Sequence, residues 1–336
     1  MRMTGVFRTA LAAGVLAGTV LPANAQIYEI VGTRAQGMGG AFVAVADDAT
    51  ATWWNPAGLA TGAYFSSVLE RGRTTEPGET RPGGPAWRGD TNAYAIIFPA
   101  LGLSYYRLRI SEIAPAASTA DAAPDRQDQG TTGTGLRSWA TSQFGMSVGQ
   151  SLGNHLVIAS TLKLVRGGLA LSSGAGAGDP LDAAADLDVS METEADLDLG
   201  AMASFGHTRI GFAIKHARQP AFGEGATRLV LRRQVRAGAA FVARGTVTVA
   251  FDADLSKTAT AFGDARHVAA GAEAWLLRRR IGLRGGVSAN TVGETSASAS
   301  TGLSAAVRKG TFVDAALTVG SDRSREGWNL GLRVTF

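Results

Sequence analysis

The sequence predicts an all-β protein, a transmembrane antiparallel β-barrel of about fourteen strands with an N-terminal hatch, or plug, of short helices and turns. Strand-length segments recur from about residue 64 onward, and several are apolar on one face only. Their connections are alternately short and long, as in barrels with periplasmic turns and outer loops. The last strand shows the alternation, since one face carries Trp328, Leu330, Leu332, Val334 and Phe336.

The expected strands can be placed one by one, with boundaries uncertain by about two to four residues. They lie near 63–71, 91–98, 101–110, 136–151, 154–167, 187–205, 208–218, 227–243, 246–256, 265–277, 281–290, 296–308, 311–321 and 325–336. An even number of strands places the first and the last residue of the barrel on the same side of the membrane, the periplasmic side. A soluble β-sandwich is the alternative, but its strands are usually only about five or six residues long.

The first residues have the features of a secretory signal. Arg2 and Arg8 precede an apolar stretch, and Ala23-Asn24-Ala25 resembles a cleavage site. We expect a signal peptide over 1–25, a hatch over 26–61 and a barrel over 62–336. A retained N-terminal membrane anchor is the alternative, but the apolar stretch is short for a spanning helix. The expected location is the outer membrane of a Gram-negative-type bacterium.

Composition excludes several classes of function. The chain has no cysteine, so it has neither a disulfide scaffold nor thiol chemistry. Its net charge of +4 is spread without a basic block, and nucleic acid is not an expected partner. The histidines are scattered and no nucleophile or phosphate-binding motif occurs, so we predict no enzyme activity, cofactor or metal site.

The region before the first strand is rich in glycine and small residues and ends in a rigid turn. Gly37, Gly39 and Gly40 permit close packing and unusual backbone conformations. Pro56 fixes its own backbone and restricts Asn55, whose side chain can bond to nearby backbone groups. These features fit a packed plug, although Asn55-Pro56-Ala57-Gly58 can also be a plain turn before the first strand.

The same region carries a recognisable pattern. Gly32 to Phe42, Asp47-Asp48-Ala49 and Asn55-Pro56-Ala57 follow one another after the signal peptide. This pattern resembles the start of the FadL-like outer-membrane transport proteins, and it is similar to PorV/PorQ-type barrels. The resemblance implies a fourteen-stranded barrel whose lumen is closed by a hatch, with Asn55, Pro56 and Ala57 matching the hatch motif.

The resemblance also implies a function. We expect passive uptake of small hydrophobic molecules, such as long-chain fatty acids or hydrocarbons, gated by the hatch. The outer loops near 72–90 and 111–135 have few large apolar residues beyond Trp87 and Ile113. This departure leaves open a PorV-like barrel that binds exported proteins without transport. Expected partners are membrane lipid, a small hydrophobic ligand and, through the strand ending at Phe336, the barrel-assembly machinery.

In each of three stretches, 186–198, 209–215 and 228–236, charged residues lie an even number of positions apart, so in a strand they point to the same face. This pattern predicts a charged lumen. The acidic set is Asp186, Asp188, Glu192, Glu194, Asp196 and Asp198. The basic set is Arg209, Lys215, Arg228, Arg232 and Arg236, and Lys163 lies on the preceding strand. Our hypothesis is that these stripes pair inside the barrel. Alternatively, much of 186–195 stands above the membrane, and a calcium site at Asp186 and Asp188 is a further alternative.

Overall fold

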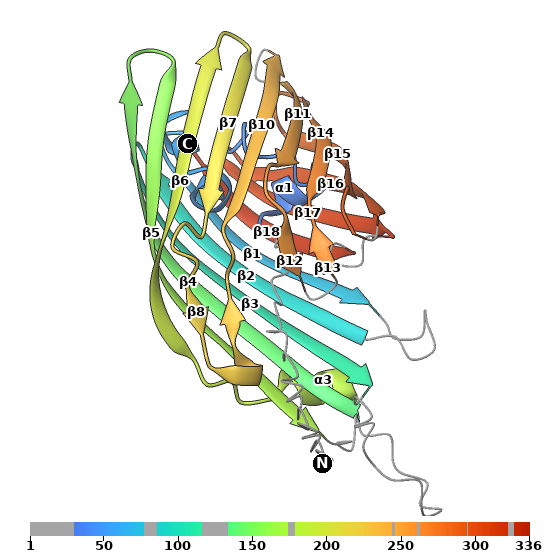
Figure 1. The fold of residues 1–336 in the computed structure, drawn as a ribbon. Coiled ribbons are helices and arrows are strands. Elements are labelled where there is room, and N and C mark those ends of the chain that lie inside the picture. Colours follow the sequence, from blue (N-terminus) through green and yellow to red (C-terminus); the bar gives the residue numbers. More distant parts are fainter. Residues whose placement is uncertain are drawn as a thin grey trace, which may run out of the picture.

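The computed structural model shows a closed antiparallel barrel with short helices inside it (Figure 1). It describes residues 30–76, 86–115, 134–173, 179–243, 246–260, 263–293, 295–321 and 326–336. The predicted signal peptide, residues 1–25, and its cleavage site lie outside the described residues. No described helix has both the length and the hydrophobicity needed to span a membrane.

Fourteen strands close the barrel, which confirms the predicted fold class and strand number. They are β1 (Ser66–Glu76), β2 (Ala86–Phe98), β3 (Leu101–Pro115), β4 (Thr134–Leu152), β5 (Leu156–Ser173), β6 (Glu192–Phe205), β7 (Thr208–Lys215), β10 (Gln234–Ala243), β11 (Val247–Asp254), β14 (His267–Leu276), β15 (Ile281–Asn290), β16 (Ser296–Arg308), β17 (Thr311–Gly320) and β18 (Gly327–Thr335).

The first and last strands complete the cylinder. β1 pairs with β18 from Ser66 opposite Thr335 to Thr74 opposite Gly327. The backbone N–H of Phe336 donates to the carbonyl of Phe65 at 3.0 Å, which extends the pairing by one step. We call this end of the barrel, where the short connections also lie, the turn end, and the opposite end the loop end.

The outward-facing residues of the strands are mostly apolar, whereas many of the inward-facing residues are small or polar. On β17, Val313, Leu317 and Val319 are about half exposed, whereas Asp314 and Thr318 are buried. The hydrocarbon core of a membrane solvates the outer set, and the backbone groups are paired between strands. The predicted alternation is thus the two-sided wall of a transmembrane barrel.

The N-terminal segment, residues 30–61, lies in the lumen. It contains α1 (Thr33–Gly37), α2 (Ala51–Trp54) and the 3-10 helix η1 (Pro56–Ala60). Nearly every residue from Val31 to Leu59 is buried, although none of these helices is longer than five residues. Such short helices are not stable alone, so their conformation depends on the surrounding wall.

Two predicted strands begin later than expected. The chain from Pro180 to Ala185 is a helix, α3, since Pro180 follows the N-cap Asp179, whose side chain accepts from Leu181 N at 2.9 Å. Residues 187–191 are therefore not part of β6. Residues 227–233 are not part of β10 either. They include β9 (Leu229–Val230), which forms a hairpin with β8 (Ala221–Phe222) through η3 (Gly225–Thr227).

The barrel is uneven in height at the loop end. β4 and β5 have 19 and 18 residues, whereas β7 and β11 have 8 each. α3 packs on β2, β3 and β4 (Figure 1). It does so on their outer face, where Arg88 pairs with Asp182 at 2.8 Å. A further small hairpin, β12 (Thr258–Thr260) with β13 (Gly263–Ala265), joins β11 to β14.

The outer face of β16 offers a test of the membrane assignment. Leu303→Arg places a charge among lipid-facing residues, and we expect it to lower the free energy of unfolding by about 2–4 kcal/mol if it lies near mid-bilayer. Val307→Arg, on the same strand beside the turn at Lys309, is the control and is expected to cost about 0–1 kcal/mol. Urea unfolding in lipid vesicles measures both, and equal costs would contradict the assignment.

Candidate functional site in the barrel lumen

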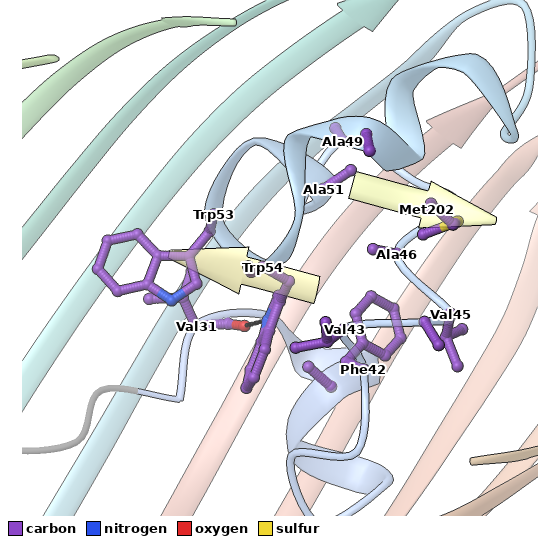
Figure 2. Packing of buried hydrophobic residues seen from close by; sticks show 14 of the residues in the cluster. Val31, Phe42, Val43, Val45, Ala46, Ala49, Ala51, Trp53, Trp54 and Met202 are labelled. Atoms are coloured by element: carbon purple, nitrogen blue, oxygen red, sulfur yellow. Dashed lines mark hydrogen bonds between the residues drawn. The ribbon is translucent and has the colours of Figure 1, made fainter. Parts of the chain in front are cut away.

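The N-terminal segment has its own apolar core against the barrel wall. Figure 2 shows Trp54, Val43 and Phe42 close together, with Met202 of β6 near Ala46. The rings of Phe42 and Trp54 meet edge to face with centroids 6.1 Å apart. Trp54 Nε1 donates to the carbonyl of Val31 at 2.6 Å, so the indole packs without leaving its N–H unpaired.

Asn55 joins two parts of the segment to the wall. Its Nδ2 donates to the carbonyl of Val43 and to that of Ala201 on β6, each at 3.0 Å. Its Oδ1 accepts from Ala57 N at 3.1 Å. Pro56 begins η1 and, like Ala57, is buried. The predicted hatch motif therefore lies where the chain changes from the plug to the first strand.

Glycines on both surfaces let backbone meet backbone. A Cβ on Gly286 of β15 would lie 2.2 Å from the carbonyl carbon of Met38, which no side chain tolerates. Gly37 packs against Gly302 of β16, and Gly39 has a φ of 67° and lies directly against the backbone of Val287. Two of the three predicted plug glycines, Gly37 and Gly39, therefore lie at close contacts between the segment and the wall, and Gly40 has a φ of 84°.

Arg34 of α1 is the centre of a buried ion-pair cluster. Its guanidinium contacts Glu273 of β14 through two hydrogen bonds of 2.8 and 3.0 Å. It also contacts Asp47 at 2.8 Å and Asp48 at 2.7 Å, both from the same segment. One side chain thereby fixes the fold of the segment and its position on the wall. The planar guanidinium carries several N–H donors and can therefore donate hydrogen bonds to several carboxylates at once.

The ionisation of Asp48 follows from this cluster. Burial alone would raise the pKa of its carboxyl, but the Arg34 guanidinium and hydrogen bonds from Thr50 hold the pKa below its usual range. Asp48 therefore stays charged at neutral pH.

The ion pairs continue around the wall from β14 to β18. Glu273 also accepts from Arg284 Nε at 2.6 Å. Asp314 on β17 lies 3.7 Å from Arg284 Nη1 and 3.0 Å from Arg333 Nε. All of these side chains are buried. This ladder of ion pairs was not predicted, although each of its members lies at an inward-facing position of its strand and that position can be read from the sequence.

Other polar contacts hold the segment to the wall on further sides. Phe42 N and Val43 N both donate to Asp252 Oδ2 of β11, at 2.7 and 2.8 Å. Thr33 N donates to Glu70 Oε1 of β1 at 3.0 Å. Thr52 shares a hydrogen bond of 2.7 Å with Tyr106 of β3. Contacts that surround the plug resist tilting as well as sliding.

A second apolar cluster lies inside the barrel near the loop end. Its members are Trp87, Leu108, Ile110, Trp139, Val165, Leu169, Phe222, Leu229 and Leu231. Those on β2 to β5 face the lumen, and the β8–β9 hairpin packs onto them with Phe222. The expectation that 72–90 and 111–135 are loops throughout is corrected here, because residues 72–76 belong to β1, 86–90 to β2 and 111–115 to β3. Trp87, the apolar exception within 72–90, lies on β2 and is completely buried.

The predicted acidic stripe is divided by the structure. Asp196 and Asp198 are buried, and Lys163 Nζ lies 2.9 and 2.7 Å from their carboxylates. His216 Nδ1 lies 2.7 Å from Asp196. The remaining four, Asp186, Asp188, Glu192 and Glu194, are exposed at the loop end. Asp186 and Asp188 are not on a strand, so the parity argument does not apply to them.

Three residues of the predicted basic stripe contact residues outside the predicted acidic stripe. Arg236 pairs with Asp254 at 2.7 Å, and Arg209 lies 3.8 Å from Asp47 of the plug. Lys215 lies over the ring of Trp53. Arg228 is exposed and Arg232 half-buried, both outside the barrel strands. Among the described residues, the lumen charges form separate clusters, some of which include the plug, rather than two facing stripes.

Little space is left between the plug and the wall on one side. A cavity of about 20 Å³ is lined by Trp53, Trp54, Lys215 and Arg236, among others. It accommodates about one water molecule and no hydrocarbon ring.

The Arg34 cluster predicts a large and specific stability effect. Arg34→Met leaves Glu273, Asp47 and Asp48 without their shared cation, and we expect a loss of about 3–5 kcal/mol in the free energy of unfolding. Adding Glu273→Met should recover part of the loss, since one stranded carboxylate is removed. Arg88→Met, which breaks a pair at the protein surface, should cost less than about 1 kcal/mol. Fully additive losses for Arg34 and Glu273 would show that the pair is not coupled.

Solved structures with the same architecture were found by comparison. The CymD monoaromatic hydrocarbon channel has a TM-score of 0.61 at 14% identity, over 91% of this chain and 97% of its own. The toluene transporter TbuX of Ralstonia pickettii gives 0.61 at 14%, over 91% and 98%.

A FadL homologue of Pseudomonas aeruginosa gives a TM-score of 0.60 at 11% identity, over 92% of this chain and 99% of its own. No family model matches the chain, and no curated protein matches it in sequence. The resemblance drawn from the N-terminal pattern is confirmed at the level of the fold: this chain has the fold of the FadL-type outer-membrane transporters.

Proposed function

We propose that this protein is an outer-membrane channel for the passive uptake of small hydrophobic molecules. The barrel has the fold of proteins described as a monoaromatic hydrocarbon channel and a toluene transporter. The proposed hatch comprises residues 26–61, with Asn55, Pro56 and Ala57 at its junction with the barrel.

The observation that carries the proposal is the position of the N-terminal segment. It fills the lumen and is held by wall contacts from Glu70, Asp252 and Glu273, which lie on three separate strands. A barrel that only anchors itself in a membrane can fill its bore with side chains from the wall. An independent plug, joined to the wall by polar contacts as well as by apolar packing, is an arrangement that can be released and reformed.

The loop-end apolar cluster suggests the class of substrate. Trp87, Trp139 and Phe222 offer flat apolar surfaces that face into the barrel. In this closed state the β8–β9 hairpin supplies Phe222 and occupies the position that a small aromatic molecule would take. We infer that small hydrocarbons are captured there and that movement of the hatch then opens the way toward the turn end, which we place at the periplasm.

A second candidate is a PorV-like barrel that binds exported proteins without transport. The observation that favours it is the number of ion pairs inside the barrel, including Lys163 with Asp196 and Arg284 with Glu273. A lumen rich in fixed charges is unfavourable for apolar solutes in its closed state.

Uptake by cells tests the proposal directly. Cells without their own hydrocarbon channels, with and without this protein, are given radiolabelled toluene or oleic acid. We expect faster initial uptake of toluene in the cells that carry the protein. Equal rates for every apolar compound, together with recovery of a secreted protein bound to the barrel, would support the second candidate instead.

A removable cross-link tests whether the plug must move. Ser66 Oγ of β1 accepts from Ala49 N at 3.2 Å, so these positions are close, and the chain has no cysteine of its own. We expect that oxidised Ala49→Cys/Ser66→Cys blocks uptake and that a reductant restores it. The two single cysteine variants are the controls. Unchanged uptake with the disulfide formed would mean that transport does not need this segment to leave the wall.

A further inference from the structure

Arginines mark the upper edge of the lipid-facing surface on three strands. Going outward along β3, the exposed face carries Leu101, Leu103 and Tyr105, and the next exposed residue is Arg107. On β1 the corresponding step is from Leu69 to Arg71, and on β5 it runs from Leu164 to Arg166.

These arginines occupy one line across the sheet. Arg71 lies opposite Asn92, which lies opposite Arg107. Arg107 lies opposite Ser142, which lies opposite Arg166. Since neighbouring strands are about 4.8 Å apart, successive arginines are separated by about 10 Å between Cα atoms. Directly below the line, on the turn-end side, lie the exposed aromatic residues Tyr94, Tyr105 and Phe144.

The three arginines differ from their neighbours one step further out. Arg73 pairs with Asp90 at 2.7 Å, and Arg109 Nη2 donates to the carbonyl of Leu187 at 2.9 Å. Arg71, Arg107 and Arg166 are exposed, and none forms an ion pair with a residue that the structure describes. A guanidinium at the edge of the apolar surface can extend its head into the polar layer of the membrane.

An apolar groove leads up to the first of them. It has a volume of about 550 Å³ and runs over the seam between the first and last strands. Its lining includes Leu69, Tyr94, Tyr105, Val313, Leu330 and Leu332, with Arg71 and Asn92 at its loop end. All six of the named apolar side chains lie on the outside of the barrel, so the groove opens to lipid and not to the lumen.

We propose that this groove and the arginine line form a binding site for the phosphorylated glycolipid of the outer leaflet. An acyl chain lies in the groove, and phosphates of the head group accept hydrogen bonds from Arg71 and Arg107. Arginine suits this role because its guanidinium donates to two phosphate oxygens at once. The proposal requires only that the barrel lies in an outer membrane, and it is independent of whether the barrel transports anything.

Native mass spectrometry of the full chain in detergent tests the site. The probes are bisphosphorylated lipid A, the same lipid with its phosphates removed, and inorganic phosphate. We expect wild type to bind the bisphosphorylated lipid, and Arg71→Gln/Arg107→Gln to bind it at least about tenfold more weakly. Arg71→Lys keeps a point charge and should be affected less.

Controls separate this site from general effects. Arg308→Gln removes an exposed arginine near the turn end and should leave binding unchanged. Heat-modifiable mobility on gels checks that every variant is folded, and the single Arg107→Gln variant replaces the double one if that fails to fold. Equal binding by wild type and variant would overturn the proposal. So would equal binding of the phosphate-free lipid, or binding of inorganic phosphate as tight as that of lipid A.

Discussion

The structure depends on the pairing of backbone hydrogen-bonding groups where no water is available. Hydrocarbon leaves an unpaired N–H or C=O no partner, so a sheet inside a membrane must close on itself. Closure here is made by β1 against β18, and the chain continues the pairing through Phe65 and Phe336. A cylinder of fourteen strands then has a bore that wall side chains do not fill. The N-terminal segment occupies the space that the wall side chains leave in this bore.

Filling the bore requires close approach and charge balance together. Glycines such as Gly286 let the wall backbone touch the segment, while Arg34, Glu273 and Asp48 hold it in register. Packing alone would leave several rotations of the plug similar in energy. Buried ion pairs with fixed partners make one orientation of the plug much more favourable, because any other orientation would leave a buried charge without a partner.

Much of the fold was predictable because side-chain alternation and turn composition are local. All fourteen strands follow the predicted order, and β15 and β16 match the predicted residues. The failures at 187–191 and 227–233 lie next to elements that the alternation did not predict, the helix α3 and the β8–β9 hairpin. Asp186 and Asp188 alternate with apolar residues as a strand does, but Pro180 starts a helix nearby and tertiary contacts decide the path.

The site was less predictable than the fold, for a related reason. Asn55 and the plug glycines stand out because their residue types restrict the backbone. The partner of Asp196 depends on which strand lies beside it, and Lys163 and Arg209 were both available on adjacent strands. Arg34 and Glu273 are separated by 239 residues, and no local pattern links them. Only the register around the whole cylinder brings such residues together.

The difference in strand length has a consequence for the shape of the loop-end rim. At about 3.4 Å per residue, β4 is about 65 Å long and β11 about 27 Å, so one flank of the cylinder projects well past the other. α3 covers the outer side of that flank. A molecule approaching the loop end along the barrel axis therefore meets β4 and β5 before it reaches the opposite, lower rim.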